Sequence, residues 1–213
     1  MKMENRPYPL SLRGELTVPP GRGWWLLKWL LGIPHYIILF FLWIAFVFVW
    51  IISFFAILFT GKHPKSLFDF KVGVMRWMWR VGFYSYHALG TDKYPPFSFE
   101  PDPDYPADLD IPYQETMSRG LVLVKWWLLA IPHYIITGFF VGSWNAGNAQ
   151  SDSNGVGIIL VLAIFSAIAV LFTGNYPGSI FKLVVGFNRW VYRVAAYVFL
   201  LTDEYPPFRL WDD

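Results

Sequence analysis

The feature that most limits what this chain can fold into is a run of 23 residues without a charged side chain, Ile37 to Phe59. A transmembrane helix needs about 20 mostly apolar residues, so this run is long enough to cross a bilayer. The apolar character begins earlier, at Trp24, and only Lys28 and the Pro34-His35 pair interrupt it. As one helix the whole stretch would be about 54 Å long, far more than a single crossing requires. We therefore expect at least one membrane span.

The composition agrees with a membrane environment. Of 213 residues, 55% are hydrophobic and 15% are charged, whereas soluble domains are roughly 25% charged. These values exclude a disordered chain and make an ordinary soluble enzyme improbable. The net charge of +2 gives no reason to expect a nucleic-acid partner. Because the chain has no cysteine, disulfides, thiolate metal sites and a cysteine nucleophile are excluded.

The chain carries two copies of one pattern, about 100 residues apart. Ile33 to Ile38 (IPHYII) returns unchanged as Ile131 to Ile136. The motifs LFTGxxP, RWxxRV and TDxYPPF also occur once in each half, in the same order. We expect a mainly α-helical integral membrane protein made of two tandem repeats, residues 1–100 and 101–213. An acidic, proline-rich stretch at about 100–110 would be an exposed linker between them.

The second copy contains a polar insertion at 142–155, which splits its apolar region into the segments 121–141 and 156–172. Each segment is just long enough to cross a bilayer. If the repeats share a fold, each contains a transmembrane helical hairpin, with the turn of the first near 42–47. The alternative is one long kinked span in the first repeat and a hairpin in the second.

Basic residues indicate the orientation. The loop 143–154 is the only one without Lys or Arg, so the positive-inside rule places it outside the cell. With two hairpins, both termini would then lie in the cytoplasm. We expect a multi-pass protein of the inner (plasma) membrane.

A helix with a basic stripe follows each apolar region, at 66–88 and 179–201. The spacing keeps the basic residues on one helical face, among apolar and aromatic neighbours. This pattern is typical of an interfacial helix whose arginines meet lipid phosphates. Alternatively the arginines line an anion pathway or bind a specific acidic lipid. The candidate lipid- or partner-binding residues are Arg76, Arg80, Arg189 and Arg193.

Three lysines in apolar surroundings are expected to extend toward the headgroups, namely Lys28, Lys71 and Lys125. Alternating apolar residues at 8–18 and 108–113 predict short strands that could form a small cytoplasmic sheet.

His35 and His133 occupy equivalent places in the two repeats. A symmetric pair of histidines could ligate a haem or a pigment metal. The simpler interpretation is that each histidine hydrogen-bonds a carbonyl freed by the neighbouring proline, or marks the membrane interface. No motif suggests another metal site or a catalytic set, so we expect no enzymatic activity and consider a membrane enzyme the weakest possibility.

The repeated segments KWLLGIPHYIILFFLWIA, AILFTGKHPKSLFDFKVGVMRW and LGTDKYPPFSF resemble a bacterial membrane family known as domain of unknown function 4389, in two copies. The resemblance covers nearly the whole chain. It implies a small integral membrane protein and carries over no ligand or catalytic residue.

These features predict a non-catalytic membrane scaffold or accessory subunit that packs against lipid and a larger membrane protein complex. The alternative is a small transporter, channel or lipid-binding protein with a site at the repeat interface. It predicts that the two IPHY segments meet around a polar cavity.

Overall fold

The computed structural model describes residues 8–17, 20–142 and 156–211, which are mainly helical. The elements follow one another in this order: β1 (Ser11–Gly14), α1 (Trp25–Thr60), α2 (Lys65–Tyr84), β2 (Ala107–Asp110), α3 (Arg119–Val124), the π-helix η1 (Lys125–Leu129), α4 (Ile131–Val141), α5 (Ile158–Thr173) and α6 (Gly178–Val198).

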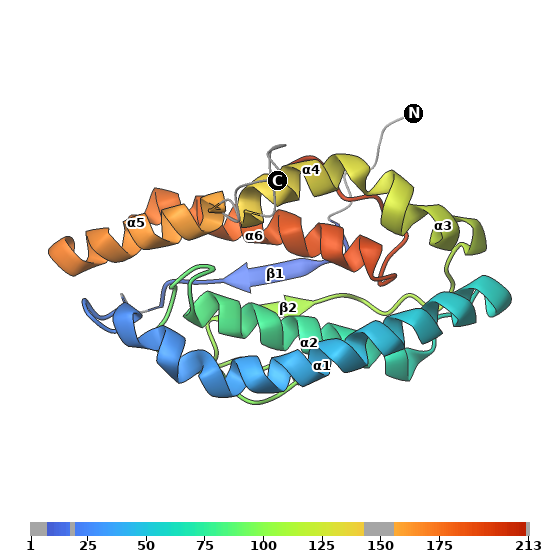
Figure 1. Ribbon diagram of the computed structural model, residues 1–213, viewed down its shortest axis with the longest axis horizontal. Helices are drawn as coiled ribbons and strands as arrows, with labels where there is room; N and C mark the ends of the chain where they lie inside the picture. The colour runs from blue at the N-terminus through green and yellow to red at the C-terminus, as the bar shows by residue number, and fades with distance from the viewer. Residues whose placement is uncertain (1–7, 18–19, 143–155, 212–213) are drawn as a thin grey trace, which may run out of the picture.

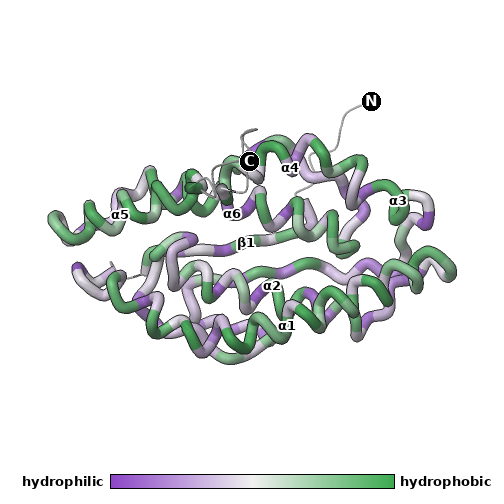
Figure 2. Tube along the Cα trace, viewed as in Figure 1, coloured by the Kyte–Doolittle hydropathy of each residue, from purple (hydrophilic) through white to green (hydrophobic). Residues whose placement is uncertain are grey.

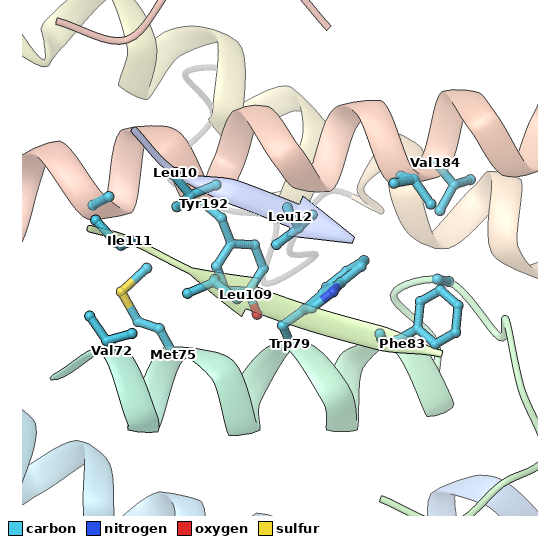
Figure 3. Close-up of a cluster of buried hydrophobic side chains, with 14 of the residues drawn as sticks. Leu10, Leu12, Val72, Met75, Trp79, Phe83, Leu109, Ile111, Val184 and Tyr192 are labelled. Carbon is cyan, nitrogen blue, oxygen red and sulfur yellow. The ribbon is translucent and has the colours of Figure 1, made fainter. Parts of the chain in front are cut away.

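The two strands lie at the centre of the molecule, between α2 and α6 (Figure 1). They pair antiparallel, with Leu12 opposite Leu109. Trp79 of α2 and Tyr192 of α6 point toward each other beside the strands, with their ring centroids 5.6 Å apart (Figure 3). Helix α1 packs outside α2, and α4 and α5 pack against α6. The core is therefore formed by the sheet and these two helices.

The two repeats interlock rather than fold side by side. Strand β1 comes from the first repeat and β2 from the second, and together they form the only sheet in the described chain. The buried hydroxyl of Tyr105 donates a hydrogen bond to the carbonyl of Arg80, 3.3 Å away. The equivalent Tyr8 donates to the carbonyl of Arg193, at 3.2 Å. Each repeat thus ties its first residues to the core helix of the other repeat.

Helix α1 runs without a break through 42–47, so the turn expected there is wrong and the first repeat has no internal hairpin. The segment contains no glycine, proline or asparagine that would stop a helix. The helix ends instead at Gly61, which has a φ of 71°. Gly174 ends α5 in the same way, with a φ of 73°. Both glycines take the left-handed conformation that an L side chain adopts with difficulty, which explains why each helix ends there.

The second apolar region is not a hairpin either. A Cβ atom added to Gly157 would lie 2.4 Å from the carbonyl carbon of Val141, so α5 begins where α4 ends. From there α5 continues toward the far end of the molecule instead of returning along α4 (Figure 1). The chain α3–η1–α4–α5 therefore corresponds to α1, with a polar insertion in its middle. The predicted external loop, 143–154, lies outside the described residues.

The π-helix η1 accommodates one additional residue. Seven positions separate Lys28 from His35 in α1, whereas eight separate Lys125 from His133. In an α-helix the additional residue would rotate the lysine about 100° away from the histidine's face. A π-helical turn at Lys125–Leu129 absorbs it, and the axis bends by 48° between Arg119–Leu129 and Ile131–Val141.

Helices α2 and α6 form as expected, immediately after Pro64 and Pro177, but their position differs from the expectation. Fourteen of the twenty residues of α2 are buried, so it is a core helix and not an interfacial one. The stretch at 100–110 is likewise only partly a linker, because its end forms β2 and buries Ala107 and Leu109. The outward apolar surface belongs to α1, α4 and α5, which are hydrophobic over almost their whole length (Figure 2).

Candidate functional site

His35 is enclosed by aromatic side chains of its own repeat. Its Nδ1 accepts a hydrogen bond from the indole N–H of Trp77 at 2.9 Å. Its ring stacks on Phe97, with centroids 4.0 Å apart, and lies 4.9 Å from the ring of Tyr94. The Tyr94 hydroxyl in turn donates to the carbonyl of Leu31 on α1. The IPHY, RW and YPPF motifs therefore meet at one point.

His133 has the same surroundings in the second repeat. Its Nδ1 accepts from Trp190 at 3.1 Å, and its ring stacks on Phe208 at 4.4 Å. We call each arrangement of histidine, tryptophan, tyrosine and phenylalanine a histidine clasp. In both clasps Nδ1 is an acceptor, so the neutral ring carries its proton on Nε2. That atom is buried in both clasps, and in the first clasp it has no hydrogen-bond partner among the described residues.

An ion pair between a buried lysine and a more exposed carboxylate closes each repeat beside its clasp. Lys28 is 1% exposed, and its Nζ lies 2.8 Å from a carboxylate oxygen of Asp92. Lys125 is fully buried and lies 2.8 Å from Asp203. The expectation that these lysines extend toward the headgroups is therefore wrong. The carboxylates were missed as partners, although the repeated Thr-Asp of the TDxYPPF motif was a signal for them.

These contacts give the histidines a structural role. Each clasp fastens the YPPF segment that ends a repeat to the long apolar helix that begins it. Within the described residues, no three His, Asp or Glu side chains lie close enough together to hold a metal ion. Haem or pigment ligation by His35 and His133 stays a prediction.

The first pair of arginines faces the sheet. Arg76 lies 3.0 Å from Asp110 and 3.2 Å from Asp108, and Arg80 lies 3.0 Å from Asp108. Arg76 is 6% exposed and Arg80 is fully buried. Both guanidinium groups therefore point toward β2 and not outward, where they could contact lipid phosphates. The stripe was identified correctly, but its carboxylate partners are 28 or more residues further along the chain.

The second pair faces β1 and the end of the chain. Arg189 donates to the carbonyl of Leu12 at 3.2 Å, and Arg193 donates to the carbonyl of Arg209 at 2.9 Å. The Arg193 guanidinium also lies over the ring of Tyr8. Binding of lipid or a partner by the four arginines stays a prediction, and the geometry gives them a cross-linking role inside the fold.

The repeats differ at one buried junction. In the second repeat the Tyr176 hydroxyl donates a hydrogen bond to the carbonyl of Ala88 at 2.8 Å. Val184, eight residues further along the chain, is fully buried. In the first repeat the equivalent positions hold His63 and Lys71. Here the ammonium group of Lys71, and not the side chain of His63, donates a hydrogen bond to the equivalent carbonyl, that of Phe199, at 2.8 Å.

With His63 and Lys71 in place of Tyr176 and Val184, the first repeat buries two basic side chains. Lys71 is fully buried, which corrects the expectation that it extends to the surface. Burial lowers the pKa of its ammonium group well below the usual value, and nearby Lys125 lowers it further. Neither ring nitrogen of His63 has a hydrogen-bond partner among the described residues. The first repeat thus holds a polar junction where the second holds a mostly apolar one.

A cavity of about 410 Å³ lies between the repeats. Its walls come from α1, α2, α4, α5 and α6, and include Trp43, Met75, Phe140 and Tyr192. Neither His35 nor His133 lines it, and nearly all of its surface is apolar. The expectation of a polar cavity formed by the two IPHY segments is therefore wrong for this interface.

The sequence matches the protein family described as Domain of unknown function (DUF4389) over residues 23–98 and 156–209. The chain belongs to this family. The two matched segments agree with the two copies expected from the motifs, and each ends within or just after a YPPF segment. No curated protein and no solved structure matches the chain. Residues of this DUF4389 protein are therefore assigned roles only from its own geometry.

Proposed function

We propose that this protein is a non-catalytic integral membrane scaffold that packs against lipid and a larger membrane protein complex. The observation that carries the proposal is the surface of α1. Only 11% of its most apolar 18-residue stretch is buried, although the helix is long and apolar enough to cross a membrane. Phe59 at its end and the equivalent Phe172 of α5 are 72% and 77% exposed. A soluble protein rarely exposes an apolar surface of this extent, so lipid or another protein is expected to cover it.

The buried face of α1 supports the same proposal. The helix turns Lys28, His35 and Ser53 toward the rest of the protein and leaves apolar side chains on its remaining surface. This is the distribution expected of a helix immersed in hydrocarbon, where polar groups must find partners inside the protein.

A pull-down tests the scaffold role. The tagged full-length protein is solubilised from native membranes in mild detergent, and co-purifying proteins are quantified. We expect stoichiometric membrane partners. Phe48, which is 63% exposed on α1, is the position to perturb. Phe48→Arg should reduce partner recovery and membrane retention, because an arginine costs about 3 kcal/mol at a bilayer centre.

Glu100→Arg, on an exposed polar segment, is the matched control and should leave both quantities unchanged. Recovery of a lone monomer or homo-oligomer from native membranes contradicts the scaffold role. Complete release of the protein from membranes by alkaline carbonate contradicts its integral character.

We propose a position in the plasma membrane with the loop 143–154 external, because this loop carries no Lys or Arg. The cytoplasmic placement of both termini was inferred from two hairpins, and since neither repeat contains one it rests on the basic residues alone. The distribution of basic residues supports this orientation. Because the chain has no cysteine, single cysteines can be labelled without background. In intact cells, Ser151→Cys should react with a membrane-impermeant maleimide and Lys93→Cys should not. The reverse pattern contradicts the orientation.

A second candidate function is binding of an apolar molecule between the repeats, and the cavity is the observation that favours it. A volume of about 410 Å³ is in the range of small-molecule sites, which is roughly 300 to 1,000 Å³. The mostly apolar lining gives little support to conduction of ions or polar solutes. This candidate therefore narrows the transporter alternative to the binding of a lipid-like molecule.

A further inference from the structure

The chemistry of the cavity restricts its occupant. No Asp, Glu, Lys or Arg is among the residues that line it. Met75 and Met78 of α2 face Val191 and Tyr192 of α6, with Phe140 of α4 at one side. An apolar cavity of this kind excludes water and is better filled by hydrocarbon. Methionine side chains are flexible, so this lining can adapt to a chain-like molecule.

The polar groups at the cavity are few and lie together. His87 and Asn188 both line it, and the amide nitrogen of Asn188 donates to the backbone carbonyl of His87 at 3.0 Å. The His87 side chain is accessible, and its ring nitrogens make no hydrogen bond within the described chain. The third polar residue, Tyr86, already donates its hydroxyl to the carbonyl of Trp25. His87 therefore remains to meet the polar group of an occupant.

This polar end exists only where the repeats differ. Asn188 of α6 takes the place that Met75 has in α2. The turn that carries His87 is two residues longer than its counterpart, because five positions separate Tyr84 from Leu89 and three separate Tyr197 from Leu200. Both turns otherwise end alike, on a buried leucine with a positive φ of 52° or 62°. The difference supplies His87 and Asn188, two of the few polar residues in an otherwise apolar lining.

We propose that the cavity binds a single-chain amphiphile with a carboxylate head, with its hydrocarbon chain between α2 and α6 and its head at His87. This inference rests on the second candidate function and names its ligand class. A carboxylate fits because the imidazole N–H can donate to it and no acidic residue of the lining opposes it. A cationic head would find no counter-charge among the lining residues.

The probe is palmitate that carries a photoactivatable diazirine on its chain, added to the full-length protein in lipid nanodiscs. Cross-linked residues are mapped by mass spectrometry. We expect labelling of cavity residues such as Met75, Met78 and Phe140. A phosphatidylglycerol with the same labelled chain distinguishes a free fatty acid from a membrane phospholipid as the source of the chain. Labelling confined to exposed residues of α1, such as Phe48, overturns the proposal.

Two variants test the two ends of the site. Ala195→Phe fills the cavity from α6 and should reduce cavity labelling about tenfold. The control Ala169→Leu on α5 lies outside the lining and should label normally. His87→Val should weaken palmitate labelling about five- to tenfold, since a hydrogen bond to a charged group is lost. It should leave labelling by the matching hydrocarbon without a carboxylate unchanged.

Equal labelling of Ala195→Phe and Ala169→Leu overturns the site, and an equal effect of His87→Val on both probes overturns the role of His87. Size-exclusion profiles and near-UV circular dichroism verify that each variant is folded. The result is independent of the pull-down, because labelling of the purified protein requires no partner protein. Failure of the ligand proposal and failure of the scaffold proposal are thus distinguishable.

Discussion

At the residue scale, the informative comparison is between side chains at equivalent positions of the two repeats. The histidine clasps and their neighbouring ion pairs repeat almost atom for atom, with hydrogen bonds of 2.9 and 3.1 Å to Nδ1. Because the same contacts form in both repeats, we assign these residues a structural role. The junction of His63 and Lys71 does not repeat, because Tyr176 and Val184 take their places.

We predict that the residues of this junction are energetically coupled. Lys71→Val leaves the Phe199 carbonyl without its donor, and His63→Tyr adds volume beside a buried lysine. Each single change should lower the free energy of unfolding by about 1 to 3 kcal/mol. The double variant recreates the pair of the second repeat and should recover much of that loss. Denaturant unfolding of the four proteins measures the coupling, and strictly additive effects contradict it.

Stability should fall in mild acid because of His63. Burial, assisted by Lys71 and Lys125, lowers the pKa of His63 from 6.5 to about 3. Between these values the unfolded chain binds a proton that the folded chain does not, so the stabilisation is complete above 6.5 and is lost as the pH falls toward 3. One such group changes the free energy of unfolding by about 1.4 kcal/mol per pH unit.

Chemical unfolding at a series of pH values between neutral and mildly acidic checks this slope. The variant His63→Tyr/Lys71→Val removes the titrating group and should show a shallower slope. An unchanged slope in that variant contradicts the assignment to His63.

At the scale of elements, α1 and its counterpart α3–η1–α4–α5 are similar in length, but only α1 is a continuous helix. Helix α1 is uninterrupted, whereas its counterpart contains a π-helical turn, a bend of 48° and the insertion between α4 and α5. The π-turn preserves the positions of Lys125 and His133 relative to each other. Both residues must reach partners near the end of the second repeat, and this requirement decides the local backbone.

Deletion of Trp127 should therefore be tolerated. It restores the seven-residue spacing found between Lys28 and His35, so η1 should become ordinary α-helix with the clasp intact. We expect a thermal midpoint equal to or above that of the parent protein. As a control, deletion of Ile136 shifts Phe140 relative to His133 and should lower the midpoint by several degrees. Unfolding caused by the Trp127 deletion contradicts this account of the π-turn.

At the scale of the whole molecule, the two repeats depend on one another. The central sheet takes one strand from each, and Tyr8 and Tyr105 cross to the opposite core helix. Residues 1–100 alone would lack β2 and leave Arg76 and Arg80 buried without their carboxylates. Removing one partner of a buried pair is expected to cost about 3 to 5 kcal/mol.

We therefore predict that residues 1–100 and 101–213 do not fold when expressed separately and do assemble when co-expressed. Copurification of an untagged half with a tagged half from detergent measures the assembly. Tyr105→Ala should weaken it more than the control Tyr113→Phe, which keeps the ring and removes only a hydroxyl that bonds the His63 carbonyl. A stable, monodisperse isolated half contradicts the prediction.

The sequence alone determined the features that depend on neighbouring residues. The duplicated motifs predicted two equivalent units, and the charge-free runs predicted the long apolar helices. The alternating stretches also predicted two short strands that could form a small sheet, although not their antiparallel register. Each of these properties follows from spacing, side-chain polarity or backbone preference over a few turns, so they are visible in the printed sequence.

Only the tertiary structure decided which surfaces face inward. The arginine stripes could have met lipid phosphates, and Lys28 and Lys125 could have reached the headgroups, because local spacing is the same in both cases. The carboxylate partner of Lys28 lies 64 residues away, at the end of the same repeat. The exchange of strands between repeats brings Arg80 to Asp108 and Arg189 to the carbonyl of Leu12. The cavity has the same origin, since its lining comes from five helices that meet only when both repeats are folded.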